Sequence, residues 1–168
     1  MSAELDAAAE ALEKSCPPDH APYERYGNEL WSFIDRRLPG YGPNWYRHLT
    51  ERFRIGGAWF NYPLDKSRHH IGNCWLVRPS SALLYAYEVW PLPQLFAHGF
   101  CCFADGDDGN VWVFKSADKP DPPVYFIEAT AWNGDMPTAN NGLYDVGLTF
   151  SGLLRYGASW NPDGSASC

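Results

Sequence analysis

The first third of the chain carries apolar residues at helical spacing. Residues 2–15 are rich in Ala, Glu and Leu, which are strong helix formers. Ser2 is the expected N-cap, and a Pro-Pro pair at 17–18 ends the segment. The apolar stripe is narrow and consists of Leu5, Ala8, Ala9 and Leu12. The pattern therefore predicts a helix that either docks loosely on the rest of the protein or frays from it.

Two further helices are predicted before residue 57. Residues 23–38 place one face of apolar and aromatic side chains at helical spacing, and Pro39-Gly40 ends the run. That face consists of Tyr26, Leu30, Phe33 or Ile34, and Arg37. Residues 44–53 form the next helix, with Asn44 as the predicted cap and a Gly pair at 56–57 just beyond its end. Its apolar face consists of Trp45, Leu49 and Phe53.

After residue 57 the periodicity changes to short β-rich runs separated by Gly, Pro, Asn and Asp. The predicted strands cover residues 58–62, 74–79, 82–90, 99–104, 110–115 and 124–132. Residues 99–115 form the clearest unit, because two apolar runs flank a polar insert at 105–109 that predicts a tight turn. Both runs are apolar on both faces, so we expect this hairpin in the middle of the sheet, covered on each side.

The remaining segments complete the predicted architecture. Residues 116–123 and 133–142 are predicted loops, and residues 144–157 form a short helix or an irregular packed segment. Strands joined by short turns, with helices gathered at the ends, indicate an α+β fold. We expect a mainly antiparallel sheet with N-terminal helices and a short C-terminal helix packed against it. The predicted organisation is a helical extension over 1–20, a single α+β domain over 21–160 and a flexible tail over 161–168.

Charge and cysteine content narrow the classes of function. The 168 residues carry 13 basic and 20 acidic side chains, a net charge of −7, which disfavours nucleic-acid binding and favours basic partners. No window approaches the roughly 18 apolar residues of a membrane span, and no basic stretch followed by an apolar run marks a secretory signal. The five cysteines fit no zinc spacing, so we expect reduced, buried thiols and a cytoplasmic location.

Aromatic residues make up an unusually large share of the sequence. They amount to 16%, with 8 Trp, 10 Tyr and 9 Phe. Such a share is typical either of a core built from rings or of a surface where some rings take part in recognition. The sequence leaves both interpretations open.

Four motifs follow one another between residues 53 and 154. Residues 53–57 end a helix with a Gly-containing turn, and residues 104–114 form a hairpin with a Gly/Asp-rich turn and an apolar second strand. Residues 123–126 read Pro-Val-Tyr-Phe, and residues 148–154 contain Thr-Phe-x-x-Leu-Leu. Their order resembles the SUKH superfamily, which includes the yeast cell-wall-assembly regulator and many bacterial immunity proteins. Segments 2–20 and 58–90 depart from the family pattern.

The SUKH resemblance carries its own expectations. It implies a single α+β domain without catalytic residues. For the bacterial members it further implies an immunity protein, which binds and neutralises a cognate toxin.

The acidic turn at 105–109 is the first candidate site. Asp105, Asp107 and Asp108 suggest a calcium loop, a turn that uses Gly and Asp for its conformation, or an acidic recognition tip. A calcium-binding EF-hand loop needs a Glu at its twelfth position, where this sequence has Ser116. Calcium is therefore not expected, while the structural turn and the recognition tip both remain open.

A second candidate site follows the last predicted strand. Glu128, Trp132 and Asp135 place an aromatic side chain between two acids, an arrangement typical of binding hot spots. The alternative is a loop that its tryptophan merely anchors. The predicted partner-binding residues are Asp105, Asp107, Asp108, Glu128, Trp132 and Asp135.

Other motifs contain some of the residues of a metal site, a catalytic thiol site or a Pro-rich ligand, but not all of them. They are His69-His70 with Cys74, His98 with Cys101 and Cys102, and the run Trp90-Pro91-Leu92-Pro93. Zinc lacks its further ligands at a familiar spacing, and a thiol nucleophile needs a base and an orienting group. The Pro-containing run is interpreted as a rigid connection between strands and not as a ligand for aromatic grooves. We therefore predict no catalytic, metal or cofactor site.

Three functional hypotheses follow from these patterns. The first is a non-catalytic immunity protein whose acidic face binds a basic toxin domain. The second is a regulatory scaffold domain without a toxin partner, and the third is a thiol-dependent enzyme. The expected partner is a protein, with neither nucleic acid nor membrane involved, and the chain is expected to be a monomer or a weak homodimer.

Overall fold

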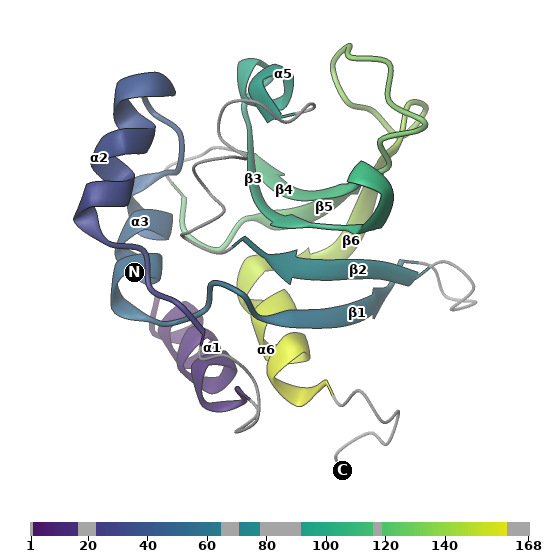
Figure 1. Ribbon diagram of the computed structural model, residues 1–168. Coiled ribbons are helices and arrows are strands. Elements are labelled where there is room, and N and C mark those ends of the chain that lie inside the picture. The colour runs from purple at the N-terminus through teal and green to yellow at the C-terminus, as the bar shows by residue number, and fades with distance from the viewer. Residues whose placement is uncertain (1, 17–22, 65–70, 78–91, 116–118, 161–168) are drawn as a thin grey trace.

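The computed structural model describes residues 2–16, 23–64, 71–77, 92–115 and 119–160 (Figure 1). The helices in these ranges are α1 (Ala3–Lys14), α2 (Asn28–Arg37), α3 (Asn44–Arg52), α5 (Leu92–Ala97), the 3-10 helix η1 (Asp107–Gly109) and α6 (Phe150–Ser159). The strands are β1 (Trp59–Pro63), β2 (Ile71–Leu76), β3 (Phe100–Asp105), β4 (Val111–Lys115), β5 (Pro123–Ile127) and β6 (Leu143–Thr149). None of the helices in these ranges has the length and apolar character needed to cross a membrane.

All six strands form one antiparallel sheet in chain order, β1-β2-β3-β4-β5-β6. The predicted α+β class is therefore confirmed, with helices at both ends of the chain. The hairpin expected in the middle of the sheet is β3–β4, which occupies its two central positions. Every side chain from Phe100 to Ala104 and from Val111 to Phe114 is buried, so both faces of this hairpin are covered.

One face of the sheet carries the larger core. Side chains of α1, α2, α3 and α6 pack there against the inward-facing residues of the strands. The Phe150 ring meets the Phe103 and Trp45 rings edge-on, at centroid distances of 4.9 and 5.7 Å. Such ring pairs each contribute about 0.5–1.5 kcal/mol beyond the area they bury. Much of the large aromatic content therefore lies in the core.

The opposite face carries a smaller core. It consists of Leu95, Phe100, Cys102, Val111, Val113, Ile127 and Trp132, with Tyr125 and Leu143 packed against it. Leu95 comes from α5, a short helix that the sequence interpretation missed when it treated residues 90–93 as a rigid connection. Residues 90 and 91 lie outside the described ranges. In Figure 1, α5 and the loop before β6 lie at the same end of the sheet.

The N-terminal helix α1 packs tightly against α6 (Figure 1). All four residues of its narrow stripe are 0–1% exposed, which contradicts loose docking or fraying. Ser2 caps the helix as predicted, since its Oγ accepts a hydrogen bond from the Leu5 backbone N–H at 3.2 Å. Arg52 pairs with Asp6 at 2.6 Å and ties α1 to α3. The boundary predicted at residue 20 remains a prediction.

The predicted bounds of α2 and α3 are partly wrong. Residues 23–27 are not helical, because Glu24 and Gly56 exchange backbone hydrogen bonds of 2.8 and 3.0 Å and hold this segment extended. In α3 the cap position belongs to Pro43, with no side-chain cap, so Asn44 is the first helical residue and not the cap. The buried face of α3 is as predicted, because Trp45 and Leu49 are buried.

The C-terminal segment divides into a strand and a helix. The sequence predicts a helix or an irregular packed segment from residue 144, but residues 143–149 form the strand β6, which pairs with β5. A left-handed Gly147, with φ of 73°, interrupts its alternation and obscures the strand pattern in the sequence. The predicted helix begins at Phe150, where the Thr149 hydroxyl accepts a hydrogen bond from the Gly152 N–H at 3.3 Å.

Two other strands also differ from their predicted bounds. Strand β2 begins earlier than residue 74, and β5 ends at Ile127 instead of residue 132. The strand predicted at 82–90 and the tail at 161–168 lie outside the described ranges.

Candidate protein-binding surface

The acidic turn, residues 105–110, joins the two central strands. The Gly106 N–H donates to the Asn110 carbonyl at 2.7 Å, and the Asn110 N–H donates to the Asp107 carbonyl at 3.0 Å. Asp108 and Gly109 adopt left-handed conformations, with φ of 57° and 79°. Asp, Asn and Gly tolerate this region best, which explains the local sequence. The fold of the turn thus presents the Asp107 and Asp108 carboxylates to solvent.

The Asn-rich loop, residues 128–142, contains the second predicted site. Its Trp132 side chain is only 4% exposed and belongs to the smaller core. The Trp132 indole N–H donates to the Asp135 carbonyl at 2.6 Å, and the Asp135 carboxylate accepts from the Asn133 amide at 2.9 Å. Trp132 therefore anchors the loop, and its ring is covered by its own chain, while Asp135 is exposed at the loop surface.

The structure brings the two predicted sites into contact at one end of the sheet. The Asn110 side-chain oxygen accepts a hydrogen bond from the Ala129 N–H at 2.8 Å. Glu128 accepts a hydrogen bond from the Tyr144 hydroxyl at 2.8 Å, and this bond raises the pKa of Tyr144. Asp107, Asp108 and Glu128 therefore share one surface.

The negative charge of the protein is concentrated in the part of the chain that builds this surface. Residues 79–154 contain nine acidic and two basic side chains, a net charge of −7, while the rest of the chain carries eleven of each. The acids of residues 79–154 are Glu88, Asp105, Asp107, Asp108, Asp118, Asp121, Glu128, Asp135 and Asp145. The rest of the chain, which includes the N-terminal helices and the strands β1 and β2, is therefore electrically balanced, and residues 79–154 are not.

Ion pairing follows the same division. Ion pairs involving α1, α2, α3 and α6 join Arg47 to Asp35, Arg52 to Asp6, Arg155 to Glu4, Arg25 to Glu13 and Lys14 to Glu10. Within the described part of the chain, no ion pair involves Asp107, Asp108, Glu128, Asp135 or Asp145. Carboxylates without cationic neighbours leave a negative potential at the surface, which attracts a basic ligand.

One exposed tryptophan beside this surface was missed by sequence reasoning. Trp75 on β2 lies directly opposite Asp105 on β3, and its side chain is 48% exposed. The sequence interpretation predicted a strand over residues 74–79 and did not single out Trp75. Successive strand residues face opposite sides, so buried Cys74 and Leu76 turn the Trp75 side chain to the other face of the sheet. Cys, Trp and Leu are all apolar, so no alternation in the sequence itself distinguishes Trp75.

The thiol and histidine candidates form no reactive centre within the described ranges. Burial raises the pKa of the Cys101 thiol to about 12 and also raises the pKa values of Cys74 and Cys102. His98 Nε2 lies 3.2 Å from the Gly134 carbonyl, which makes it a loop contact. Those ranges hold no group of three or more His, Cys, Asp or Glu side chains suited to a metal ion. His69 and His70 lie outside them.

Comparison with known proteins found no match to a family model, to a curated protein or to a solved structure.

Proposed function

We propose that this protein is a non-catalytic binding domain whose acidic surface recognises a basic partner protein. The observation that carries the proposal is the charge division, since the whole net charge of −7 falls in residues 79–154. Within the described part of the chain, no ion pair involves Asp107, Asp108, Glu128, Asp135 or Asp145. Complementary potentials accelerate association and exclude wrongly charged partners.

The proposed biological role is that of an immunity protein. The resemblance to the SUKH superfamily supports this role, and the partner would then be a basic toxin domain in the cytoplasm. A regulatory scaffold domain would use the same surface for a host protein. The two roles differ in one outcome, because only an immunity protein restores the growth of cells that express the partner.

The thiol-enzyme hypothesis receives less support from the geometry. A catalytic cysteine has a depressed pKa and access to solvent. Cys101 and Cys102 are instead buried in the central strand β3, and burial raises both pKa values. We therefore propose a binding function for this domain in preference to a thiol-dependent activity.

The proposal is tested by isolating the partner and measuring its affinity. The protein is immobilised, incubated with lysate of its source cells, and the retained stoichiometric protein is identified and purified. The dissociation constant is then measured for the wild type and for a triple variant, at about 50 and 300 mM salt. The triple variant combines Asp107→Asn, Asp108→Asn and Asp135→Asn. Asn preserves the left-handed conformation at 108, so the turn keeps its shape.

We expect the triple variant to bind about ten-fold more weakly and the wild type to lose affinity at the higher salt. The matched control combines Glu4→Gln, Glu10→Gln and Glu29→Gln, which removes the same charge from the helical side. It should bind like the wild type. If both variants weaken binding equally, the effect depends on the net charge of the protein and not on this surface. An affinity that changes neither with salt nor in the triple variant would contradict the proposal.

A further inference from the structure

We propose that Trp75 is the aromatic contact of the acidic surface and that it stacks on an arginine of the basic partner. This inference rests on the proposed function and adds the residue and the chemistry of recognition. Its elements are the exposed indole on β2 and the acids of the adjoining turn, Asp105, Asp107 and Asp108. We refer to these four residues as the Trp75 corner.

The Trp75 indole makes no ring contact or hydrogen bond with any residue that the structure describes, and the side chain is 48% exposed. The other large exposed aromatic side chains are engaged. The Trp59 ring meets the Trp160 ring edge-on at 4.8 Å, and the Tyr144 hydroxyl donates to Glu128. A partner can cover the exposed half of this indole without breaking a hydrogen bond or ring contact of the described chain, and tryptophan is enriched among binding hot spots.

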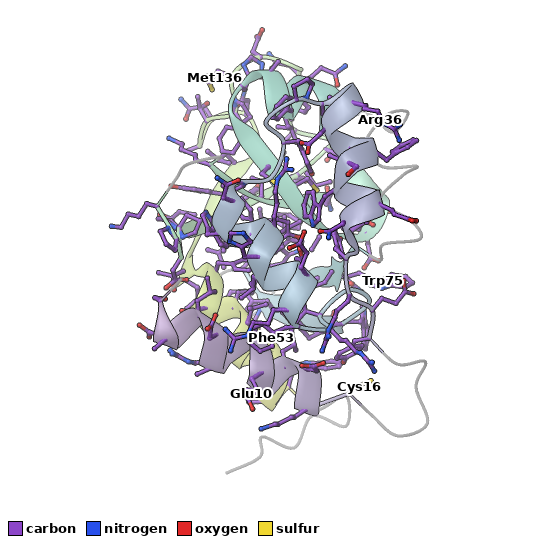
Figure 2. All side chains as sticks on the ribbon, turned by 90° about the vertical axis from the view of Figure 1, so that its left-hand side faces the viewer. Glu10, Cys16, Arg36, Phe53, Trp75 and Met136 are labelled. Carbon is purple, nitrogen blue, oxygen red and sulfur yellow. The ribbon has the colours of Figure 1, made fainter. Side chains whose placement is uncertain are left out.

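The sheet register brings the indole beside the acidic turn. Trp75 and Asp105 are direct cross-strand partners, so their side chains leave the sheet on the same face. Exposed Asp107 and Asp108 follow in the turn that β3 enters. Carboxylates thus border the aromatic surface on the β3 side. Figure 2 shows Trp75 at the edge of the molecule, well separated from Met136 in the Asn-rich loop.

Arginine is the ligand that fits both features at once. Its planar guanidinium stacks on an indole face while its edge donates paired hydrogen bonds to a carboxylate. Lysine carries a compact charge and lacks this fork. An apolar side chain would match the indole alone and would leave the Asp107 and Asp108 carboxylates without a cation.

The protein already contains this arrangement in its helical part. The Arg47 guanidinium carbon lies 4.9 Å from the Trp31 ring centroid. The same guanidinium donates from Nη1 to the Asp35 carboxylate at 2.6 Å. Trp31, Arg47 and Asp35 therefore form an internal stack of indole, guanidinium and carboxylate. The Trp75 corner offers the indole and, from Asp107 and Asp108, the exposed carboxylates of the same arrangement, and the partner supplies the arginine.

The test uses two defined basic probes, nona-arginine and nona-lysine, each with a fluorescent label. Their affinities for the full chain are measured by anisotropy at about 50 mM salt. We expect the wild type to prefer nona-arginine, and Trp75→Thr to weaken nona-arginine binding about five-fold. We also expect nona-lysine binding to be nearly unchanged by Trp75→Thr, while Trp75→Tyr retains part of the arginine preference. Threonine suits an exposed strand position, and circular dichroism verifies the fold.

Met136→Ala is the matched control, because it removes an exposed apolar side chain, 52% exposed, outside the Trp75 corner. It should leave both affinities unchanged. The proposed arginine contact is overturned if the Trp75→Thr variant binds nona-arginine as tightly as the wild type does. It is also overturned if this variant loses the same affinity for both peptides. The combined Asp107→Asn and Asp108→Asn variant separates the two proposals. If the combined variant weakens binding and Trp75→Thr does not, the acidic surface is supported and the aromatic contact is rejected. If neither variant weakens binding, both proposals fail.

Discussion

Trp75 and Trp132 lie on the same face of one sheet, each close to acidic residues, yet their environments are opposite. Trp132 is 4% exposed and its indole N–H donates a hydrogen bond, whereas Trp75 is 48% exposed and its indole makes no hydrogen bond with the residues that the structure describes. The row of cross-strand partners that contains Trp75 explains the difference. Across β1, β2 and β3 this row presents Trp59, Trp75 and Asp105, and across β4 to β6 it continues as Val111, Ile127 and Leu143.

The row is exposed at one end and covered at the other. The Asn-rich loop folds back over the β4–β5 part and inserts Trp132 against Val111 and Ile127. At the β1–β2 end, the Trp59 and Trp75 side chains reach solvent. A tryptophan flanked by acids therefore becomes a structural anchor or a recognition residue according to whether its own chain covers it. Local sequence context alone therefore does not assign the role of such a tryptophan.

Thiol labelling has the largest expected effect and tests whether the sheet beneath the Trp75 corner is an inert core. In a Cys16→Ser, Cys168→Ser background, the remaining thiols are those of Cys74, Cys101 and Cys102. We expect labelling at least about a thousand-fold slower in the native state than in urea, because the buried thiols react only after opening. Rapid labelling of one of these thiols in the native state would instead support an enzyme and would contradict an inert core beneath the Trp75 corner.

The Trp132→Ala variant tests whether Trp132 anchors the Asn-rich loop and stabilises the fold. It removes a buried ring and leaves the Asp135 carbonyl without its donor, so unfolding free energy should fall by about 3 kcal/mol. The Trp75→Thr variant should change it by less than about 0.5 kcal/mol, because the side chain is exposed. Urea titrations followed by circular dichroism measure both values. Equal stability losses would show that the two tryptophans do not differ as described.

The Arg47→Met variant tests the internal stack that serves as the template for the Trp75 corner. Its guanidinium donates to Asp35, to the Gly42 carbonyl and to the Tyr41 carbonyl, at 2.6 to 2.7 Å. Losing these charged hydrogen bonds should cost about 2 kcal/mol of unfolding free energy. The more exposed Arg52, which pairs with Asp6, provides the control, and Arg52→Met should cost less than about 1 kcal/mol. If Arg47→Met lowers the unfolding free energy less than Arg52→Met does, the internal stack does not support the arrangement proposed for the Trp75 corner.

The smallest expected effect is the pH dependence of the stability that the Arg47–Asp35 pair of this stack contributes. The hydrogen bond from Arg47 lowers the pKa of Asp35 below its usual value near 3.8. A depressed folded-state pKa contributes stability above the unfolded pKa, and this contribution is lost as pH falls through the folded value. The stability advantage of the wild type over Asp35→Asn should therefore be constant near pH 6 and shrink below about pH 4. An advantage that grows on acidification would contradict the assignment.

The sequence predicted the central hairpin, the α3 face and the fold class because each depends on local periodicity. The 105–109 insert between two apolar runs could form only a turn, and Trp45 and Leu49 are one helical turn apart. Strand β6 was missed because left-handed Gly147 breaks its alternation. The role of Trp132 required knowledge of the loop path, which depends on a contact between Asn110 and Ala129 that no local pattern reveals.

The candidate surface was predictable only in part for the same reason. The acids of the turn were identified because Gly and Asp cluster there in the sequence. The exposure of Trp75 depends on where the Asn-rich loop ends over the sheet, and this is a tertiary property. The charge division between residues 79–154 and the rest can be read from the sequence, but its meaning depends on the ion pairs of the helical part.

The most direct test of the central claim is a single nuclear magnetic resonance titration of the ¹⁵N-labelled protein with nona-arginine. The eight tryptophans give indole N–H signals, and spectra of Trp75→Thr and Trp132→Ala assign the two that matter. We predict that the Trp75 indole signal and the backbone amides of residues 105–109 shift saturably, while the Trp132 signal stays in place. Shifts of Trp132 and its loop with an unchanged Trp75 would contradict the account.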